Sequence, residues 1–80
     1  MKLTDAYVLA KVEAGQDQQV LKEVKKIAGV RQATPTYGFY DMHIEVSFDK
    51  MEELDKFIFE QIRRIPGVKE TATLIAFKRI

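Results

Sequence analysis

KKIAGVRQAT, residues 25–34, returns 38 residues later as RRIPGVKETAT, residues 63–73. In both copies two basic residues and an isoleucine precede a glycine, an order typical of the C-terminal end of a helix. In both copies a valine follows the glycine and opens a segment that we interpret as a β-strand. The repeat therefore predicts a fold built from two similar halves, each with a helix followed by a strand.

Hydrophobic periodicity predicts the remaining elements. Apolar residues at every second position indicate strands, and apolar residues three and four apart indicate amphipathic helices. The resulting order, β-α-β-β-α-β, is typical of a ferredoxin-like α+β sandwich, a four-stranded antiparallel sheet with two helices on one face. Asp49 and Glu52 are expected to form a capping box for the second helix. The expected strands are 6–13, 30–37, 42–48 and 68–77, and the helices begin at Asp17 and Asp49 and carry the apolar residues Val20, Leu21, Val24 and Ile27, then Met51, Leu54, Phe57, Ile58, Ile62 and Ile65.

Two features of the predicted sheet favour self-association. Pro35 cannot donate a backbone hydrogen bond, which predicts that its strand is an edge strand or carries a bulge. The last strand is apolar on both faces, and Tyr7 and Leu9 point away from the helices, so apolar surface is expected on the open face. A long apolar edge strand also invites association. We therefore expect a homo-oligomer with the open sheet face and the last strand in the contact.

The composition fits a single domain over residues 1–80. With 46% hydrophobic and 31% charged residues, the chain is expected to be globular. Thirteen basic and twelve acidic residues leave a formal charge of +1, which gives no electrostatic reason to expect nucleic-acid binding. The sequence shows neither a signal peptide nor an apolar run approaching about 18 residues, so we expect a cytoplasmic protein without membrane contact.

The motifs of several familiar chemistries are missing from the sequence. The chain has no cysteine, and we expect no metal and no cofactor. Its four glycines stand apart, so none forms a phosphate-binding loop. His43 is the single histidine, and it is predicted on the open face near Glu45. We favour a partly buried interface histidine, because a general base or a metal site usually needs convergent partners.

The turn YGFYD, residues 37–41, holds the candidate binding residues. Gly38 fits a tight hairpin turn with a positive φ. Asp41 begins the third strand near the free N–H groups of the turn, and Thr71 and Thr73 share one face of the last strand. A carboxylate, hydroxyls and free N–H groups could bind the two charged ends of an amino acid. The competing interpretation is that the aspartate stabilises the turn and the threonines only favour a strand.

GVRQATPTYGFYDMHIEV, residues 29–46, and LDKFIFEQIRRIPGVKETATLIAF, residues 54–77, resemble the effector-binding domain of the Lrp/AsnC transcriptional regulators, also called the RAM domain. The resemblance implies dimers that pair through their sheet faces, as in a dimeric α+β barrel, and that assemble further into rings or discs. It also implies that small effectors, typically amino acids, bind in clefts between dimers. By this resemblance Asp41 would receive the ammonium group of the ligand. The remaining ligand-binding residues, Gly38, Phe39, Tyr40, Thr71 and Thr73, would receive its carboxylate.

Two differences from the family pattern bear on function. The regulators carry a helix-turn-helix DNA-binding domain before the RAM domain, whereas the first expected strand here begins at Ala6, so a stand-alone RAM domain that does not bind DNA specifically is expected. Phe39 stands where the family often has an acidic or small residue. We expect a non-enzymatic amino-acid sensor that acts on full-length Lrp/AsnC regulators by co-assembly. The alternatives are a small dimeric α+β barrel enzyme that uses His43 and a purely structural assembly module.

Overall fold

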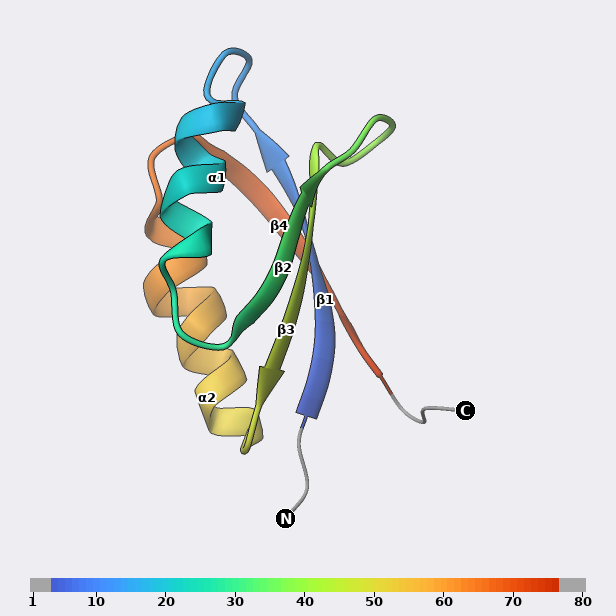
Figure 1. Ribbon diagram of the computed structural model, residues 1–80, viewed down its shortest axis with the longest axis vertical. Coiled ribbons are helices and arrows are strands. Elements are labelled where there is room, and N and C mark those ends of the chain that lie inside the picture. The colour runs from blue at the N-terminus through green and yellow to red at the C-terminus, as the bar shows by residue number, and fades with distance from the viewer. Residues whose placement is uncertain (1–3, 77–80) are drawn as a thin grey trace.

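The strands and helices follow each other along the chain in the predicted β-α-β-β-α-β order. The computed structural model describes residues 4–76, and Figure 1 shows α1 and α2 on the same side of the sheet. This arrangement confirms the ferredoxin-like α+β sandwich. The strands are β1 (Thr4–Val12), β2 (Val30–Pro35), β3 (Met42–Phe48) and β4 (Val68–Ile75), and the helices are α1 (Asp17–Lys25) and α2 (Met51–Lys56), which continues into a π-helical turn, η1 (Phe57–Gln61), and a 3₁₀ turn, η2 (Ile62–Arg64).

The antiparallel strands lie in the order β2-β3-β1-β4, which makes β2 and β4 the edge strands. Pro35 ends β2, and the pairing of β2 with β3 shifts register between Val30 and Gln32. The prediction made from Pro35, that its strand is an edge strand or carries a bulge, is therefore confirmed. β2 is two residues shorter than predicted because the N–H of Thr36 donates to the carbonyl of Asp41 (2.9 Å) and closes the loop there.

The hydrophobic core fills the space between the sheet and the helices. Ala6, Val8 and Ala10 alternate along β1 and are fully buried, as the period of two predicts. After α1, Gly29 has a φ of +95°, and a Cβ atom there would collide with the Phe48 ring. Glycine is required at this position for both reasons. The other buried core residues are Val12, Val20, Val24, Met42, Ile44, Val46, Leu54, Phe57 and Ile62.

The second helix differs from the expected one at its start. Glu53, not Glu52, receives the capping hydrogen bonds, because its Oε1 accepts from the N–H groups of Asp49 (3.1 Å) and Lys50 (3.3 Å). The capping box predicted from Asp49 and Glu52 was wrong, since the helix begins at Met51 and Glu53 is its third residue. Met51 itself is 45% exposed, so it does not join the buried stripe as predicted.

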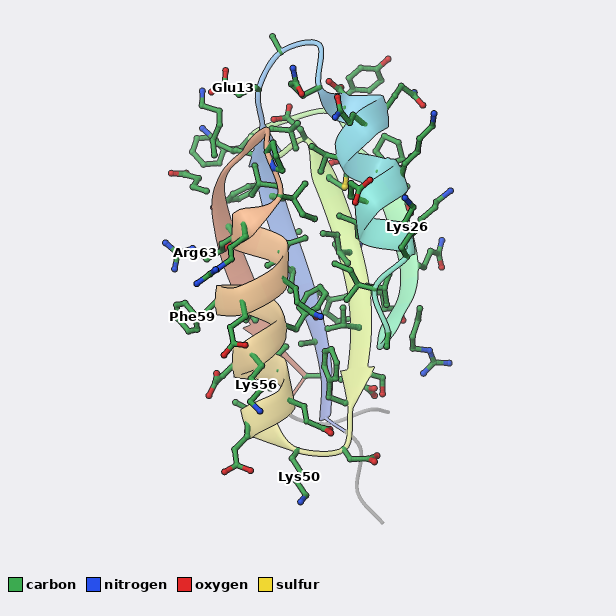
Figure 2. All side chains as sticks on the ribbon, turned by 90° about the vertical axis from the view of Figure 1, so that its left-hand side faces the viewer. Glu13, Lys26, Lys50, Lys56, Phe59 and Arg63 are labelled. Carbon is green, nitrogen blue, oxygen red and sulfur yellow. The ribbon has the colours of Figure 1, made fainter. Side chains whose placement is uncertain are left out.

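The second helix also changes its winding. The N–H of Ile62 donates to the carbonyls of Ile58 and Phe57, and this wider π-helical turn brings Phe57 and Ile62, five residues apart, to the same buried side. Phe59 lies off this stripe and is largely exposed, with the Arg63 guanidinium 5.3 Å from its ring centroid. Figure 2 shows both side chains pointing outward from the helix.

The open face of the sheet carries the alternate residues of β1 and β3. Tyr7 and Leu9 lie on it, as predicted, since the residues between them are buried under the helices. At the β4 edge, Leu74 is 56% exposed on the open face and Ile75 is 49% exposed on the helix side. The prediction of an edge strand that is apolar on both faces is confirmed for these residues, whereas Phe77 lies outside the described residues. Within residues 4–76 no helix is long and apolar enough to cross a membrane.

Candidate functional site

The loop between β2 and β3, residues 36–41, projects beyond the end of the sheet (Figure 1). Two hydrogen bonds close its base, from the N–H of Thr36 to the carbonyl of Asp41 (2.9 Å) and from the Thr36 hydroxyl to the carbonyl of Tyr40 (3.0 Å). At the tip Gly38 has a φ of +116°, as a tight turn requires. The N–H groups of residues 37–40 have no hydrogen-bond acceptor within residues 4–76. The loop therefore presents free donors at its tip on a closed base.

Asp41 joins this loop to the central strand β1. Its N–H donates to the carbonyl of Ala10 (2.9 Å), and its carboxylate oxygen Oδ2 accepts from the N–H of Val12 (2.8 Å). The carboxylate thus takes the place of a strand carbonyl just before β3 begins at Met42, beside the last residue of β1. Its second oxygen, Oδ1, has no hydrogen-bond partner within residues 4–76. Asp41 therefore has a structural role through one carboxylate oxygen, while the other is not used within the described part of the chain.

A hollow of about 330 Å³ lies on the helix side of the loop. Asp41 lines it together with Asp17, the first residue of α1. No lysine or arginine lines the hollow, so its two carboxylates favour a positively charged group. No sequence pattern indicates that Asp17 lies here, because the packing of α1 beside the loop brings it close. Pro35, Thr36 and Tyr37 complete the lining.

Phe39 lies at the tip of the loop, next to the open face of the sheet. Phe39 is 70% exposed, and its ring makes an edge-to-face contact with Tyr40, with 5.0 Å between ring centroids. The Lys11 ammonium group of β1 lies 3.8 Å from the centroid of the Phe39 ring. This distance is typical of a cation–π interaction.

Residues 5–80 match the model of one protein family, described as the Lrp/AsnC ligand binding domain. The chain belongs to this family. HTH-type transcriptional regulator FL11 of Pyrococcus horikoshii is 36% identical over 73 residues, which are 91% of this chain and 48% of FL11. The chain thus spans about half the length of the curated relatives it matches, and these relatives are named as transcriptional regulators.

Solved structures agree with this membership. The crystal structure of FFRP-DM1 is 34% identical and has a TM-score of 0.89, and the match covers 92% of this chain and 99% of that one. The transcriptional regulator NMB0573 from Neisseria meningitidis is 18% identical and has a TM-score of 0.88. This match covers 96% of this chain and 51% of NMB0573. At that identity the likeness shows the fold alone.

Thr71 and Thr73 of this Lrp/AsnC domain lie on β4, paired with Ala10 and Val8 of β1. They share one face, as predicted, and that face is the helix side of the sheet. Because β1 lies between β3 and β4, it separates both threonines from Asp41. Within one chain the six predicted binding residues therefore form two groups, the loop residues and the two threonines.

His43 of the Lrp/AsnC domain lies on the open face, where its ring stacks on Tyr7 at a centroid distance of 5.3 Å and an interplanar angle of 16°. It is partly exposed, and neither His43 nor Glu45 lines the hollow beside the loop. Across residues 4–76, no three His, Asp or Glu side chains are grouped so that they could hold a metal ion. The geometry at His43 is that of a packed ring on a sheet surface.

Proposed function

We propose that this Lrp/AsnC domain binds a small amino-acid effector at the loop 36–41 and thereby modulates transcriptional regulators of the same family. The observation that carries the proposal is the hollow beside Asp41, because it lies next to free N–H groups in the same loop. Its volume of about 330 Å³ falls within the range of small-molecule sites, about 300 to 1,000 Å³. The domain acts as a sensor and not as an enzyme.

The polar groups of the loop suit the two ends of an amino acid. The free Oδ1 of Asp41 accepts from the ammonium group, and Asp17 adds a second negative charge nearby. The N–H groups of Gly38, Phe39 and Tyr40 donate to the carboxylate. Thr71 and Thr73, which lie beyond β1 in the same chain, would enter the site from a neighbouring subunit.

Self-association is the second part of the proposal. Tyr7, Leu9 and Leu74 give the open face an apolar surface, and Ile75 extends it around the free edge of β4. Two copies pair through these surfaces, and the dimers assemble further. The same surfaces would allow co-assembly with full-length regulators of the family, in the cytoplasm and without direct DNA contact by this domain.

The test is a thermal-shift measurement with each of the twenty amino acids. NMB0573 was crystallised as a complex with L-Met, so methionine belongs in the first round. A ligand at 100 times its dissociation constant adds roughly 2.7 kcal/mol to the free energy of unfolding and raises the melting temperature. We expect at least one amino acid to produce such a shift.

Asp41→Asn is the matched variant for this test. Asparagine keeps an oxygen that can accept from the N–H of Val12 but loses the negative charge, so the fold is retained and the ligand's ammonium group loses its partner. We expect the shift to disappear in Asp41→Asn and to persist in the control Asp49→Asn, which removes an exposed carboxylate away from the loop. An equal shift in both variants, or no shift with any amino acid, would contradict the proposed site and favour a purely structural assembly module.

A further inference from the structure

Lys11 is a charged residue of the sheet whose partner is an aromatic ring. It lies on the open face of β1, opposite Glu70 of β4 in the strand register. The ion pair found within residues 4–76 is Lys26 with Glu23, and Lys11 pairs with no carboxylate there. Its ammonium group instead lies over the Phe39 ring at 3.8 Å. The side chain is thus directed toward the loop.

Three consecutive residues of β1 hold the loop. The carbonyl of Ala10 and the N–H of Val12 bind Asp41 at its base, and between them the side chain of Lys11 contacts Phe39 at its tip. The base is held by hydrogen bonds of 2.8 and 2.9 Å in a partly buried position. Among residues 4–76, the contact that holds the tip is made through the exposed Phe39, whose other ring contact is with its own neighbour Tyr40.

We propose that Lys11 is a positioning residue for the loop: its cation–π contact with Phe39 fixes the tip and orients the free N–H groups of residues 37–40. Gly38 stands at the tip with a φ of +116°, and apart from its two chain neighbours no atom of residues 4–76 would lie within 4 Å of a Cβ atom there. The effect of Lys11 on ligand affinity rests on the proposed function, whereas its effect on loop order does not. A preorganised tip strengthens binding because less conformational entropy is lost with the ligand.

The first test needs no ligand and uses NMR spectroscopy of the full chain. The ring current of Phe39 should shift the Lys11 side-chain protons nearest the ammonium group upfield of those of the other lysines, and Phe39→Leu should abolish that shift. Lys11→Met should lower the backbone order parameters of residues 37–40, whereas Lys11→Arg, which keeps a cation, should preserve them. Lys69→Met, an exposed lysine of β4, is the control. An unshifted Lys11, or a loop equally ordered in Lys11→Met, would overturn the proposal.

The second test measures affinity by calorimetry, with the amino acid that gives the largest thermal shift. An exposed cation–π contact corresponds to about a two- to five-fold change in binding. We expect Lys11→Met and Phe39→Leu each to weaken binding by this factor, the double variant to weaken it no further, and Lys11→Arg to bind like the unmodified protein.

The outcomes separate the two proposals. Unchanged affinity in Lys11→Met, or additive losses in the double variant, would overturn the positioning role in binding while the effector site stands. If no amino acid binds at all, the proposed effector site is wrong, and so is the proposed effect of Lys11 on affinity. The NMR measurement then decides by itself whether Lys11 orders the loop.

Discussion

At the scale of single residues, Gly29 sets how closely the chain after α1 approaches β3. Its φ is +95°, and the Phe48 ring occupies the space that a Cβ atom would need. The Phe48 ring in turn packs against the buried ring of Phe57, with centroids 5.5 Å apart. A side chain at position 29 would therefore disturb the aromatic contact between the sheet and the second helix.

Gly29→Ala should lower the free energy of unfolding by about 2 to 4 kcal/mol, from backbone strain at positive φ and from overpacking against Phe48. Urea denaturation measures this change. Gly38→Ala is the control, since its φ is +116° but a Cβ atom there would meet open space, and it should lose only the strain, about 1 to 2 kcal/mol. Equal losses in the two variants would show that the Phe48 contact is unimportant.

The sequence identified Asp41 as the residue to examine but left open whether it stabilises the turn or binds a ligand. The structure shows that one oxygen stabilises the turn by accepting from Val12, which lies 29 residues earlier in the chain. No local pattern could indicate that partner, because it depends on β1 pairing with β3. The contribution of Asp17 to the hollow also depends on tertiary structure, because the packing of α1 beside the loop brings it there.

At the scale of elements, the two edge strands differ in their protection. β2 carries Pro35, an exposed Arg31 and a register shift, all of which discourage pairing with another strand. β4 has no charged residue from Thr71 to Ile75. The unprotected strand is also the one that exposes Leu74 and Ile75, so β4 is the edge suited to contact another subunit.

Leu74→Lys should therefore weaken self-association. A buried leucine contributes about 1.5 to 3 kcal/mol, so its loss together with a new charge should raise the dissociation constant at least about tenfold. Sedimentation analysis over a range of protein concentrations measures the change. Gln18→Lys, which adds the same charge on the exposed surface of α1, is the control and should leave the dissociation constant unchanged. An unchanged dissociation constant in Leu74→Lys as well would exclude β4 from the interface.

The elements themselves were predictable where one periodicity holds throughout. The alternation in β1 and β3 was correct, and so was the α1 stripe for Val20, Leu21 and Val24, because one periodicity holds through each element. Ile27 packs against the core as expected, but it lies beyond the end of α1 at Lys25. The second helix was predicted as one regular α-helix, and the π-helical turn between Phe57 and Ile62 was missed. Apolar residues at 57, 58 and 62 fit a spacing of four as well as five, so the sequence does not distinguish the two windings.

At the scale of the whole molecule, the proposed function assigns assembly to the apolar open face and effector binding to the projecting loop. The open face and the β4 edge carry the exposed apolar residues that would form the assembly surface, and the loop 36–41 carries the polar groups that would form the binding site. Lys11 and Phe39 lie where these regions meet. A ligand can change the assembly only if it binds one assembly state more tightly than another.

We expect a saturating amino-acid effector to change the distribution of oligomers. The measurement is native mass spectrometry or size-exclusion chromatography with light scattering, with and without the amino acid that gives the largest thermal shift. Asp41→Asn should assemble as the unmodified protein does without ligand and should not respond to it. An assembly that stays the same while ligand is bound would show that binding and assembly are uncoupled.

The way in which β1 holds the loop has a consequence for how such a site can change over evolutionary time. Ala10 and Val12 contribute only backbone atoms to the base of the loop, so substitutions of their side chains leave these attachments available. The tip depends on the side chains of Lys11 and Phe39, and loss of the cation at position 11 or of the aromatic ring at position 39 removes the contact. The attachments to β1 therefore tolerate side-chain changes at positions 10 and 12 as long as Asp41 keeps its carboxylate, whereas single substitutions at positions 11 and 39 alter the tip. If the proposed function holds, such substitutions would give domains that respond to different effectors.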